Sequence, residues 1–245
     1  MNTPTCEVNA NGDKSWYLNG KRHREDGPAI EETNGYTAWY QNGQRHREDG
    51  PAIEWVNGDK SWYLNDKLHR VDGPAIEWAN GDNEWYINGK QHRTDGPAID
   101  YSTYEAWYLN GNMHREDGPA IEYINGYKAW YLTGKIHRED GHAIEYSNGD
   151  KEWYLNDKLH REDGPAFEGV DGGNEWYIHG KPHREDGPAF EWADGTKEWY
   201  LNGNYHRKDG PAIEHANGDK EWYLNGKYIT DSPLVWMILQ YEVNN

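Results

Sequence analysis

A histidine followed three residues later by an aspartate recurs along this chain, and both side chains are ordinary zinc ligands. If each recurrence contributes two strands, equivalent histidines lie roughly 9–10 Å apart, too far for one ion to bridge. One His and one Asp per recurrence also supply too few ligands, so we expect no metal site. We interpret the aspartate as a turn former, and the histidine as a donor to loop backbone that packs on a tryptophan. The histidine column is His23, His46, His69, His92, His114, His137, His160, His183 and His206.

Calcium and enzyme chemistry find little support. Asn-Gly-Asp and Glu-Asp-Gly recur, but calcium needs several oxygens converging on one point, and no known calcium-loop pattern is present. Serines are sparse, the single cysteine is Cys6, and no Gly-rich phosphate loop follows a strand. Paired carboxylates occur in every recurrence, which is the opposite of a unique catalytic centre. We predict no enzyme activity and no cofactor.

The elements that position these side chains belong to a repeat. A Trp-Tyr pair returns every 23 residues, with one interval of 22 between Trp85 and Trp107. Ten copies of one motif indicate a repeat protein in which neighbouring copies share a core. The tryptophans of the pairs are Trp16, Trp39, Trp62, Trp85, Trp107, Trp130, Trp153, Trp176, Trp199 and Trp222.

Each repeat has an Asn-Gly turn between two runs of strand-forming residues. In residues 53–64, Asn57-Gly58 predicts a two-residue hairpin of type I′, with positive φ at both central positions. Alternation then predicts one apolar face, with the tryptophans in the core, and a second face with tyrosine beside glutamate. The first face holds Ile53, Trp55, Trp62 and Leu64, and the second holds Ala52, Glu54, Ser61 and Tyr63.

The second connection of each repeat is longer. In residues 65–73 it opens with Asn-Asp and closes with His-Arg-Val-Asp-Gly, and Pro74 ends it by fixing φ. Because this loop aligns in all copies, the sequence predicts a rim on which His, Arg and Asp form parallel columns.

Short segments flank the array. Residues 1–13 are interpreted as an N-terminal cap strand, residues 14–228 as the repeat array, and residues 229–245 as a C-terminal cap. Ser232-Pro233 is a helix start signal, so a short helix, or else a final strand, is expected to close the sheet edge. The predicted fold is all-β: ten 23-residue hairpin repeats in an elongated twisted sheet or a solenoid, with a short C-terminal capping segment.

The charge is strongly acidic and evenly spread. Asp and Glu total 43 against 25 Lys and Arg, which gives a net charge of −18. Direct nucleic-acid binding needs clustered Lys and Arg, so this balance favours a basic protein partner instead. No secretory signal follows Met1, and the longest apolar run, at 234–239, is too short for a membrane span. We predict a cytoplasmic protein.

The repeat resembles the MORN motif, the membrane occupation and recognition nexus. Residues 63–70 lie where that motif has Trp-x-Asn-Gly-Lys-x-His-Gly, and residues 77–82 match its Tyr-x-x-Gly end. The likeness covers about residues 7–228 and departs at the loop, where His-Arg-Glu-Asp-Gly-Pro replaces His-Gly-x-Gly. Such a variant is similar to MORN-like arrays of bacterial antitoxin-type, phage and giant-virus proteins. The resemblance implies successive hairpins for protein contact, dimerisation or lipid association, without catalytic residues.

Together these features predict a non-enzymatic protein-interaction repeat protein, a scaffold or an inhibitor or decoy acting on a basic protein surface. An exposed tryptophan strip would also favour a homodimer. The alternative is a small-ligand-binding or sequestering protein that uses the Tyr face and the His-Arg rim. The candidate partner surface is Tyr63, Tyr86, Tyr108, Tyr131, Tyr154, Tyr177, Glu122, Glu145 and Glu168, and the candidate rim is His92, Arg93, His114, Arg115, His137 and Arg138.

Overall fold

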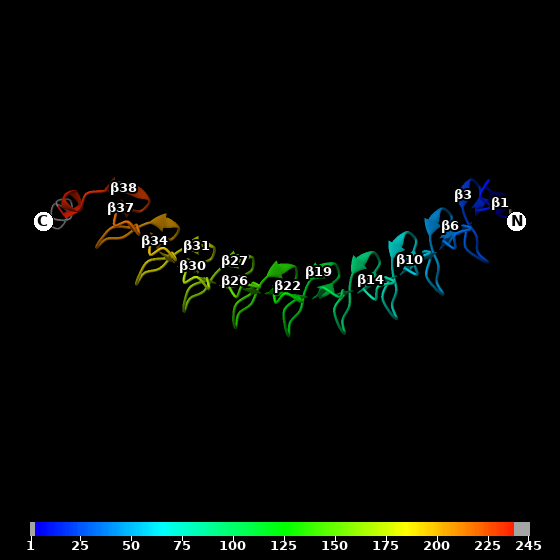
Figure 1. Ribbon diagram of the computed structural model, residues 1–245, viewed down its shortest axis with the longest axis horizontal. Coiled ribbons are helices and arrows are strands. Elements are labelled where there is room, and N and C mark those ends of the chain that lie inside the picture. The colour runs from blue at the N-terminus through cyan, green and yellow to red at the C-terminus, as the bar shows by residue number, and fades with distance from the viewer. Residues whose placement is uncertain (1–2, 238–245) are drawn as a thin grey trace. The chain divides into compact units, whose positions relative to one another are not determined.

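The computed structural model describes residues 3–237 and is nearly all β, 37% strand and 2% helical. Antiparallel hairpins follow one another along the chain, which confirms the predicted fold class (Figure 1). The chain divides into two compact units, Met1–Glu116 with Ala120–Ile124, and Asp117–Pro119 with Asn125–Asn245. No helix among the described residues is long and apolar enough to cross a membrane.

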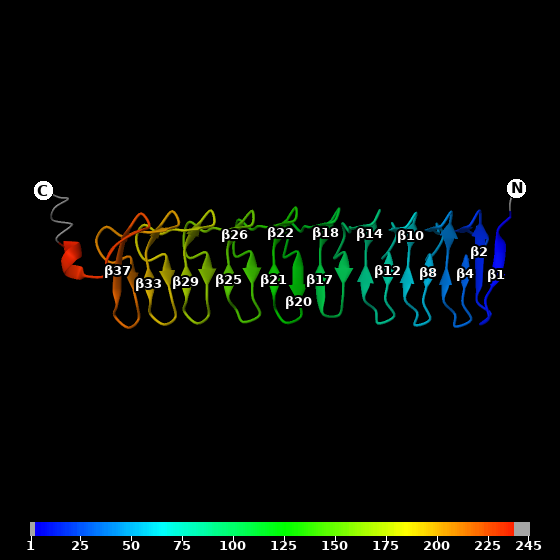
Figure 2. The same ribbon diagram turned by 90° about the horizontal axis from the view of Figure 1, so that it is seen from above.

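Each repeat of the first unit contributes sheet strands that pair with the strands before and after them (Figure 2). These strands are β1 (Thr5–Val8), β2 (Lys14–Leu18), β4 (Ile30–Glu31), β5 (Thr37–Ala38), β8 (Ile53–Glu54), β9 (Lys60–Ser61), β12 (Ile76–Glu77), β13 (Asn83–Glu84), β16 (Ile99–Asp100), β17 (Tyr104–Ala106) and β20 (Ile121–Tyr123). In the third repeat, for example, Ser61 of β9 lies opposite Ile53 of β8 on one side and Ile76 of β12 on the other.

The second unit repeats this pairing. Its sheet strands are β21 (Lys128–Ala129), β24 (Ile144–Glu145), β25 (Lys151–Glu152), β28 (Phe167–Glu168), β29 (Asn174–Glu175), β32 (Phe190–Glu191), β33 (Lys197–Glu198), β36 (Ile213–Glu214) and β37 (Lys220–Leu224). Here Glu152 of β25 lies between Ile144 of β24 and Phe167 of β28. The same ladder of hairpins therefore builds both units.

A second, smaller hairpin follows each pair of sheet strands. In the first unit these rim hairpins are β2 with β3 (Lys21–Arg22), β6 (Tyr40–Gln41) with β7 (Gln44–Arg45), β10 (Tyr63–Leu64) with β11 (Lys67–Leu68), β14 (Tyr86–Ile87) with β15 (Lys90–Gln91), and β18 (Tyr108–Leu109) with β19 (Asn112–Met113). In the second unit they are β22 (Tyr131–Leu132) with β23 (Lys135–Ile136), β26 (Tyr154–Leu155) with β27 (Lys158–Leu159), β30 (Tyr177–Ile178) with β31 (Lys181–Pro182), β34 (Tyr200–Leu201) with β35 (Asn204–Tyr205), and β37 with β38 (Lys227–Thr230).

The type I′ turn lies in the rim hairpin, not at the Asn-Gly turn where the sequence predicted it. Asn65 and Asp66, between β10 and β11, have φ of 51° and 62°. Positive φ at both central residues defines a type I′ turn. The connection at residues 65–73, predicted as one long loop, therefore begins as a hairpin.

The Asn-Gly turn of the sheet hairpins is a three-residue loop. Within Val56-Asn57-Gly58, only Gly58 has positive φ, at 94°. The Gly58 amide donates to the Trp55 carbonyl at 2.9 Å, and the Trp55 amide donates to the Asp59 carbonyl at 2.9 Å. This is a type I turn completed by a left-handed glycine. The Asp59 carboxylate also accepts the Ala79 amide of the next repeat at 2.8 Å, which links neighbouring turns.

The extra loop residue exchanges the two faces that the sequence predicted. A two-residue turn would set Ile53 opposite Trp62, whereas Ile53 lies opposite Ser61. A shift of one residue moves every side chain of a strand to the other face. Tyr63 therefore shares the face of Ile53, and Trp62 shares the face of Glu54. The predicted face assignment is wrong for this reason.

The core of each unit consists of small and aliphatic side chains with tyrosines packed on them. Alanines ahead of the core isoleucines have no exposed surface, as at Ala75 and Ala98, both 0% exposed. In the first unit, a cluster of Ile30, Ala38 and Ile53 receives tyrosine rings that include Tyr63. The repeat tryptophans from Trp16 to Trp199 are half-buried. Trp222 is buried, with 3% of its surface exposed. The prediction that the tryptophan column forms the core is therefore wrong for most repeats.

The short interval between Trp85 and Trp107 leaves the sheet register intact. There the Tyr101 amide donates to the Tyr104 carbonyl at 3.0 Å, and Ile99 lies opposite Ala106. Because the missing residue is taken from the turn, Ala106 occupies the place that Ser61 has in the third repeat.

Short elements lie at both described ends of the chain. Strand β1 pairs with β2, with Cys6 opposite Trp16. A short helix at residues 233–237 follows Ser232, whose carbonyl accepts the Trp236 amide at 3.1 Å. Residues 1–2, and residues 238–245 of the predicted C-terminal cap, lie outside the described residues.

Candidate functional site

The loop that carries each His-Arg pair is built around its arginine. Arg93 donates from Nε to Asp95 at 2.9 Å and from Nη1 to the Pro97 carbonyl at 3.1 Å. Its guanidinium lies 3.9 Å from the ring centroid of Trp85. The hydrogen bond from Arg93 lowers the pKa of Asp95, so this carboxylate stays ionised at neutral pH. The loop therefore presents the fixed carboxylate of Asp95 beside the Trp85 ring, and the Arg93 guanidinium covers one face of that ring.

The predicted glutamate column lies on this arginine face rather than beside the tyrosines. Arg161 contacts Glu168 at 2.6 Å, and Arg115 contacts Glu122 at 3.2 Å. Glu145 lies 3.4 Å from His142, which stands where most repeats have proline. These carboxylates lie on a half-buried face, where Glu122 and Glu168 form ion pairs with arginine and Glu145 contacts an imidazole whose pKa burial lowers. They do not point freely into solvent.

Each His-Arg loop also contains a glycine that the arginine requires. A Cβ atom added at Gly73 would lie 2.8 Å from Arg70 Cζ, and one added at Gly164 would lie 2.8 Å from Arg161 Cζ. Such a contact is shorter than side-chain carbons tolerate, so the glycine makes room for the guanidinium.

The histidine column joins consecutive repeats through backbone hydrogen bonds. His92 Nδ1 accepts the amide of Asn110 at 3.1 Å, and His69 Nδ1 accepts the amide of Asn88 at 3.1 Å. The same bond reaches the side chains of His23, His160, His183 and His206, whereas His46 Nδ1 lies 3.3 Å from the Asn65 amide and 2.9 Å from Asn65 Oδ1. The sequence predicted that these histidines donate to the backbone, and here they accept instead. An Nδ1 that accepts cannot be protonated without losing the bond.

In the second unit, His160 of this column packs against a second histidine, His179. Burial lowers its pKa, the neighbouring His179 lowers it further, and Glu162 opposes both. The two imidazole rings stack with centroids 4.5 Å apart, and the His179 amide donates to His160 Nδ1 at 3.2 Å. Proton uptake by His160 therefore places charge beside a second imidazole and removes a hydrogen bond between repeats.

We expect this pair to make the second unit less stable in mild acid. Because the pKa of His160 is lower in the folded chain than in the unfolded chain, the unfolded state binds the proton first. The stabilisation is present above the unfolded pKa of about 6.5 and is lost as pH falls through the folded value. His179→Asn restores the residue that most repeats have here and should reduce the loss. Urea midpoints between neutral and mildly acid pH test this; identical pH dependence in parent and variant would contradict it.

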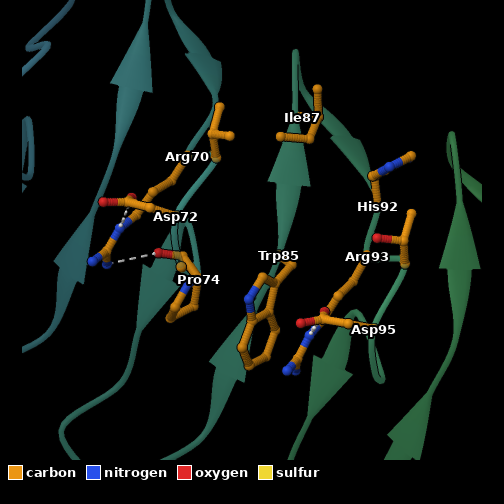
Figure 3. A pocket seen from close by; sticks show the side chains of 11 residues that line it. Arg70, Asp72, Pro74, Trp85, Ile87, His92, Arg93 and Asp95 are labelled. Atoms are coloured by element: carbon orange, nitrogen blue, oxygen red, sulfur yellow. Dashed lines mark hydrogen bonds and ion pairs between the residues drawn. The ribbon is translucent and has the colours of Figure 1, made fainter.

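Half-open pockets lie between His-Arg loops of consecutive repeats (Figure 3). In the first unit, a pocket of about 610 Å³ has residues 70–74 as one wall, 92–95 as the other, and Trp85 with Ile87 between them. Figure 3 shows Trp85 between the loop of Arg70 and Pro74 and the loop of Arg93. We call this pocket A.

Two further pockets have the same construction. Pocket B, of about 580 Å³, precedes pocket A and lies between residues 47–51 and 69–72, over Trp62 and Leu64. In the second unit, pocket C of about 900 Å³ lies between residues 138–141 and 160–163, over Trp153 and Leu155. The rim residues His92, Arg93 and Arg138 predicted from the sequence line these pockets.

The predicted tyrosine surface is engaged within the protein. Tyr86 donates its hydroxyl to Glu84 at 2.8 Å, and burial together with Glu84 raises its pKa. Tyr177 donates to Glu175 at 2.9 Å, and Arg45 lies 4.0 Å over the Tyr63 ring. Tyr63, Tyr86, Tyr108, Tyr131, Tyr154 and Tyr177 are all half-buried, and none lines pockets A to C. The structure therefore separates the tyrosines from the His-Arg rim.

The loop-tip carboxylates were predicted only in part: sequence reasoning placed the Asp column on the rim as turn formers, but it did not treat these aspartates, or the glutamates beside them, as site residues. Their side chains are far more exposed than the strand glutamates, for example 82% at Asp95 and 85% at Glu162. The recurring Glu-Asp-Gly triplet could have identified them, because glycine and its neighbours mark the most exposed part of a loop. We define the tip carboxylates as Glu25, Asp26, Glu48, Asp49, Asp72, Asp95, Glu116, Glu139, Asp140, Glu162, Asp163, Glu185, Asp186 and Asp209.

Within the described residues, no group of three or more His, Cys, Asp or Glu side chains is arranged to hold a metal ion. The sequence matches no protein-family model and no curated protein.

Proposed function

We propose that this chain is a non-enzymatic protein-interaction repeat protein, a scaffold or an inhibitor, and that its loop rim binds a basic surface of another protein. The observation that carries the proposal is the row of tip carboxylates. Arginine hydrogen bonds fix the tip aspartates, as at Asp95 and Asp163, while their side chains stay more than 80% exposed. The resemblance to MORN repeats supports the same role, and we propose a cytoplasmic protein of that variant class.

Preorganised negative charge suits this role physically. Charge complementarity accelerates encounter and selects the sign of the partner more than it adds raw affinity. A net charge of −18 extends that attraction beyond the rim itself. Binding should therefore weaken steeply with salt, because screening acts beyond about 8–10 Å at physiological ionic strength. Mimicry of a phosphate backbone is one form that such an inhibitor would take.

Reversal of charge at the tips tests the proposal. Glu139, Glu162 and Glu185 are 82–85% exposed in the second unit. The triple Lys variant should bind a lysine-rich probe, a peptide of four Ala-Ala-Lys triplets, about tenfold more weakly at low salt, because attractive charges become repulsive. Titration calorimetry at low and high salt measures the effect.

The strand glutamates provide the matched control. Reversal of Glu122, Glu145 and Glu168 changes net charge equally but breaks the ion pairs with Arg115 and Arg161 and the contact with His142. This variant should lose stability, with a lower urea midpoint, whereas the tip variant keeps it. Equal binding by the tip variant and the parent, or affinity that does not change with salt, would contradict the proposal.

Self-association belongs to the same proposal. In the first unit the turn edge exposes apolar side chains on consecutive repeats, among them Trp55, Val56 and Trp78. Exposed apolar patches on soluble chains mark contacts, and a two-fold pairing covers such a patch in both copies. We propose a homodimer through this edge.

Sedimentation equilibrium tests the dimer. Val56→Asp should raise its dissociation constant about tenfold, because a carboxylate would be buried in the interface. Glu139→Gln, on the exposed rim of the other unit, is the control and should leave the dimer unchanged. A parent chain that stays monomeric at high concentration would contradict the proposed pairing.

The small-ligand alternative has less support. Pockets of 580–900 Å³ have the size of ligand sites. They nevertheless recur from repeat to repeat, and the tyrosines that the alternative invoked do not line them. Repeated half-open pockets suit an extended partner better than one enclosed small molecule.

A further inference from the structure

Pockets A and B follow one another at the period of the repeat and share a wall. Arg70, Val71 and Asp72 line both of them. Two strands per repeat at about 4.8 Å each place equivalent points of the two pockets about 9.6 Å apart. A segment that occupies both pockets must present equivalent groups at this spacing.

Among regular peptide conformations, polyproline II matches this spacing best. It rises about 3.1 Å per residue with three residues per turn, so every third side chain points the same way at about 9.3 Å. On a strand, side chains of one face recur at about 6.7 Å, and two such steps exceed the pocket spacing. On an α-helix, a side chain returns to the same face after seven residues, at about 10.5 Å. Of the three conformations, polyproline II comes closest to the pocket spacing.

The chemistry of the pockets fits the same conformation. Each pocket has an apolar base of one tryptophan and one aliphatic side chain, Trp85 with Ile87 or Trp62 with Leu64. Aromatic-lined grooves are the usual receptors for polyproline II segments. A segment in that conformation leaves its carbonyl groups without internal hydrogen bonds, so it needs donors from the receptor.

The indole groups supply such donors. Among the described residues, Trp222 Nε1 is buried without a partner, and no other side-chain donor shares that state. Trp85 Nε1 has no acceptor among the described residues and is not buried, so it is open to a ligand. Figure 3 shows this nitrogen on the side of the ring that faces the loop of Arg70 and Pro74.

The shared wall differs from most loops of the chain. Val71 occupies the tip position that is glutamate in most repeats, and the residue is 82% exposed. The next loop has Thr94 there. Val71 thus forms an apolar ridge between pockets A and B. Carboxylates flank this ridge, Glu48 and Asp49 on the side of pocket B and Asp95 on the side of pocket A. The first unit thus combines an apolar ridge with negative charge around it.

We infer that pockets A and B bind a basic, proline-rich segment of a partner protein in the polyproline II conformation, with one three-residue turn per pocket. The prolines of the segment pack on Trp62 and Trp85 and against Val71. Its backbone carbonyls accept hydrogen bonds from the two indole groups, and its Lys or Arg side chains lie along the tip carboxylates. The inference rests on the proposed function and narrows its partner to a chemical class.

Three synthetic peptides of equal length and charge test it on the full chain. The first has four Pro-Pro-Lys triplets, the second has the same composition with lysines at irregular spacing, and the third has four Ala-Ala-Lys triplets. The regular proline peptide should bind about tenfold more tightly than the alanine peptide, because its bound conformation is already formed. It should also bind several-fold more tightly than the irregular peptide. Calorimetry at one low salt concentration measures all three.

Two variants test whether the peptide binds in pockets A and B. Val71→Glu restores the tip residue of most other loops, so it is compatible with the fold while adding negative charge. It should weaken binding of the regular proline peptide, whereas simple charge attraction predicts tighter binding. Trp85→Phe keeps a ring beneath Arg93 but removes the indole donor, and it should weaken the same peptide several-fold. Val170→Glu in the second unit adds the same charge at a residue that is 65% exposed and lines none of pockets A to C, so it is the control and should leave this binding nearly unchanged.

The outcomes separate this inference from the proposed function. If the three peptides bind equally and with strong salt dependence, the acidic rim attracts basic chains and the polyproline inference is wrong. If Val71→Glu tightens binding of the regular proline peptide, the inference is again wrong. If none of the peptides binds, the proposed function itself fails.

Discussion

Replacement of Trp130 by alanine should lower the free energy of unfolding by roughly 3 kcal/mol, the low end of the range for large aromatic residues. The low end applies because the ring is half-buried. Arg138 lies 4.3 Å over its centroid, and the His142 ring meets it edge-on at 5.6 Å. The substitution removes both contacts and leaves the guanidinium without its stacking surface. Urea denaturation followed by tryptophan fluorescence and circular dichroism measures the change.

His137→Ala in the same repeat is the matched comparison. His137 Nδ1 lies 3.2 Å from Asn156 Oδ1, and its Nε2 lies 3.7 Å from Glu139. Loss of one such hydrogen bond costs about 1 kcal/mol. Trp130→Ala should therefore be the more damaging of the two. If His137→Ala proves worse, the histidine column rather than the arginine–tryptophan stack holds the repeats together.

Arg161→Ala should be the second large effect, at roughly 2–3 kcal/mol, because a single side chain there makes four separate contacts. Arg161 bonds to Asp163 at 2.9 Å, to the Pro165 carbonyl at 3.2 Å and to Glu168 at 2.6 Å, and it covers the Trp153 ring at 4.1 Å. Exposed ion pairs contribute little, so the carbonyl bond and the stacking supply most of the effect. Arg161→Lys should recover little of it, since an ammonium can neither stack nor bridge three acceptors in a plane.

Gly164→Ala tests whether the loop needs a glycine at this position to accommodate the Arg161 guanidinium. The added Cβ would lie 2.8 Å from Arg161 Cζ, so the substitution alone should destabilise by about 1–3 kcal/mol. In the Arg161→Ala background the clash is gone, and the same substitution should cost much less. Urea midpoints of the four chains give the coupling energy. Additive effects would mean that the glycine serves some purpose other than making room for the guanidinium.

The sequence was sufficient to predict the repeat, the hairpins and the helix start at Ser232-Pro233, because each depends on local chemistry. The periodic Trp-Tyr pairs and Asn-Gly turns indicate a hairpin array without any tertiary information. The rim was predicted from the alignment of the His-Arg loops, and pockets A to C lie there.

The errors have one common origin in turn geometry. Asn57-Gly58 suits a two-residue turn by composition, but a left-handed glycine alone also closes a three-residue loop. That single residue decided whether Ile53 faces Ser61 or Trp62, and with it the placement of the tyrosines, tryptophans and glutamates. The amino-acid composition of a turn does not reveal whether its loop has two or three residues. The acceptor role of the histidines was equally hidden, because backbone amides of the next repeat carry no side-chain signature.

The hydrogen bonds that join repeats have one further consequence. The His Nδ1 bonds connect residues 18 or 19 apart, as from Asn110 to His92, and the turn bonds connect residues 20 apart, as from Ala79 to Asp59. Each repeat therefore offers its successor the same acceptors that it uses in its predecessor. An in-frame duplication or deletion of one whole repeat inside a unit would recreate these junctions without any compensating substitution. The gene can thus change the number of pockets in single steps, and under the proposed polyproline II binding the length of the partner segment that fits would change with it.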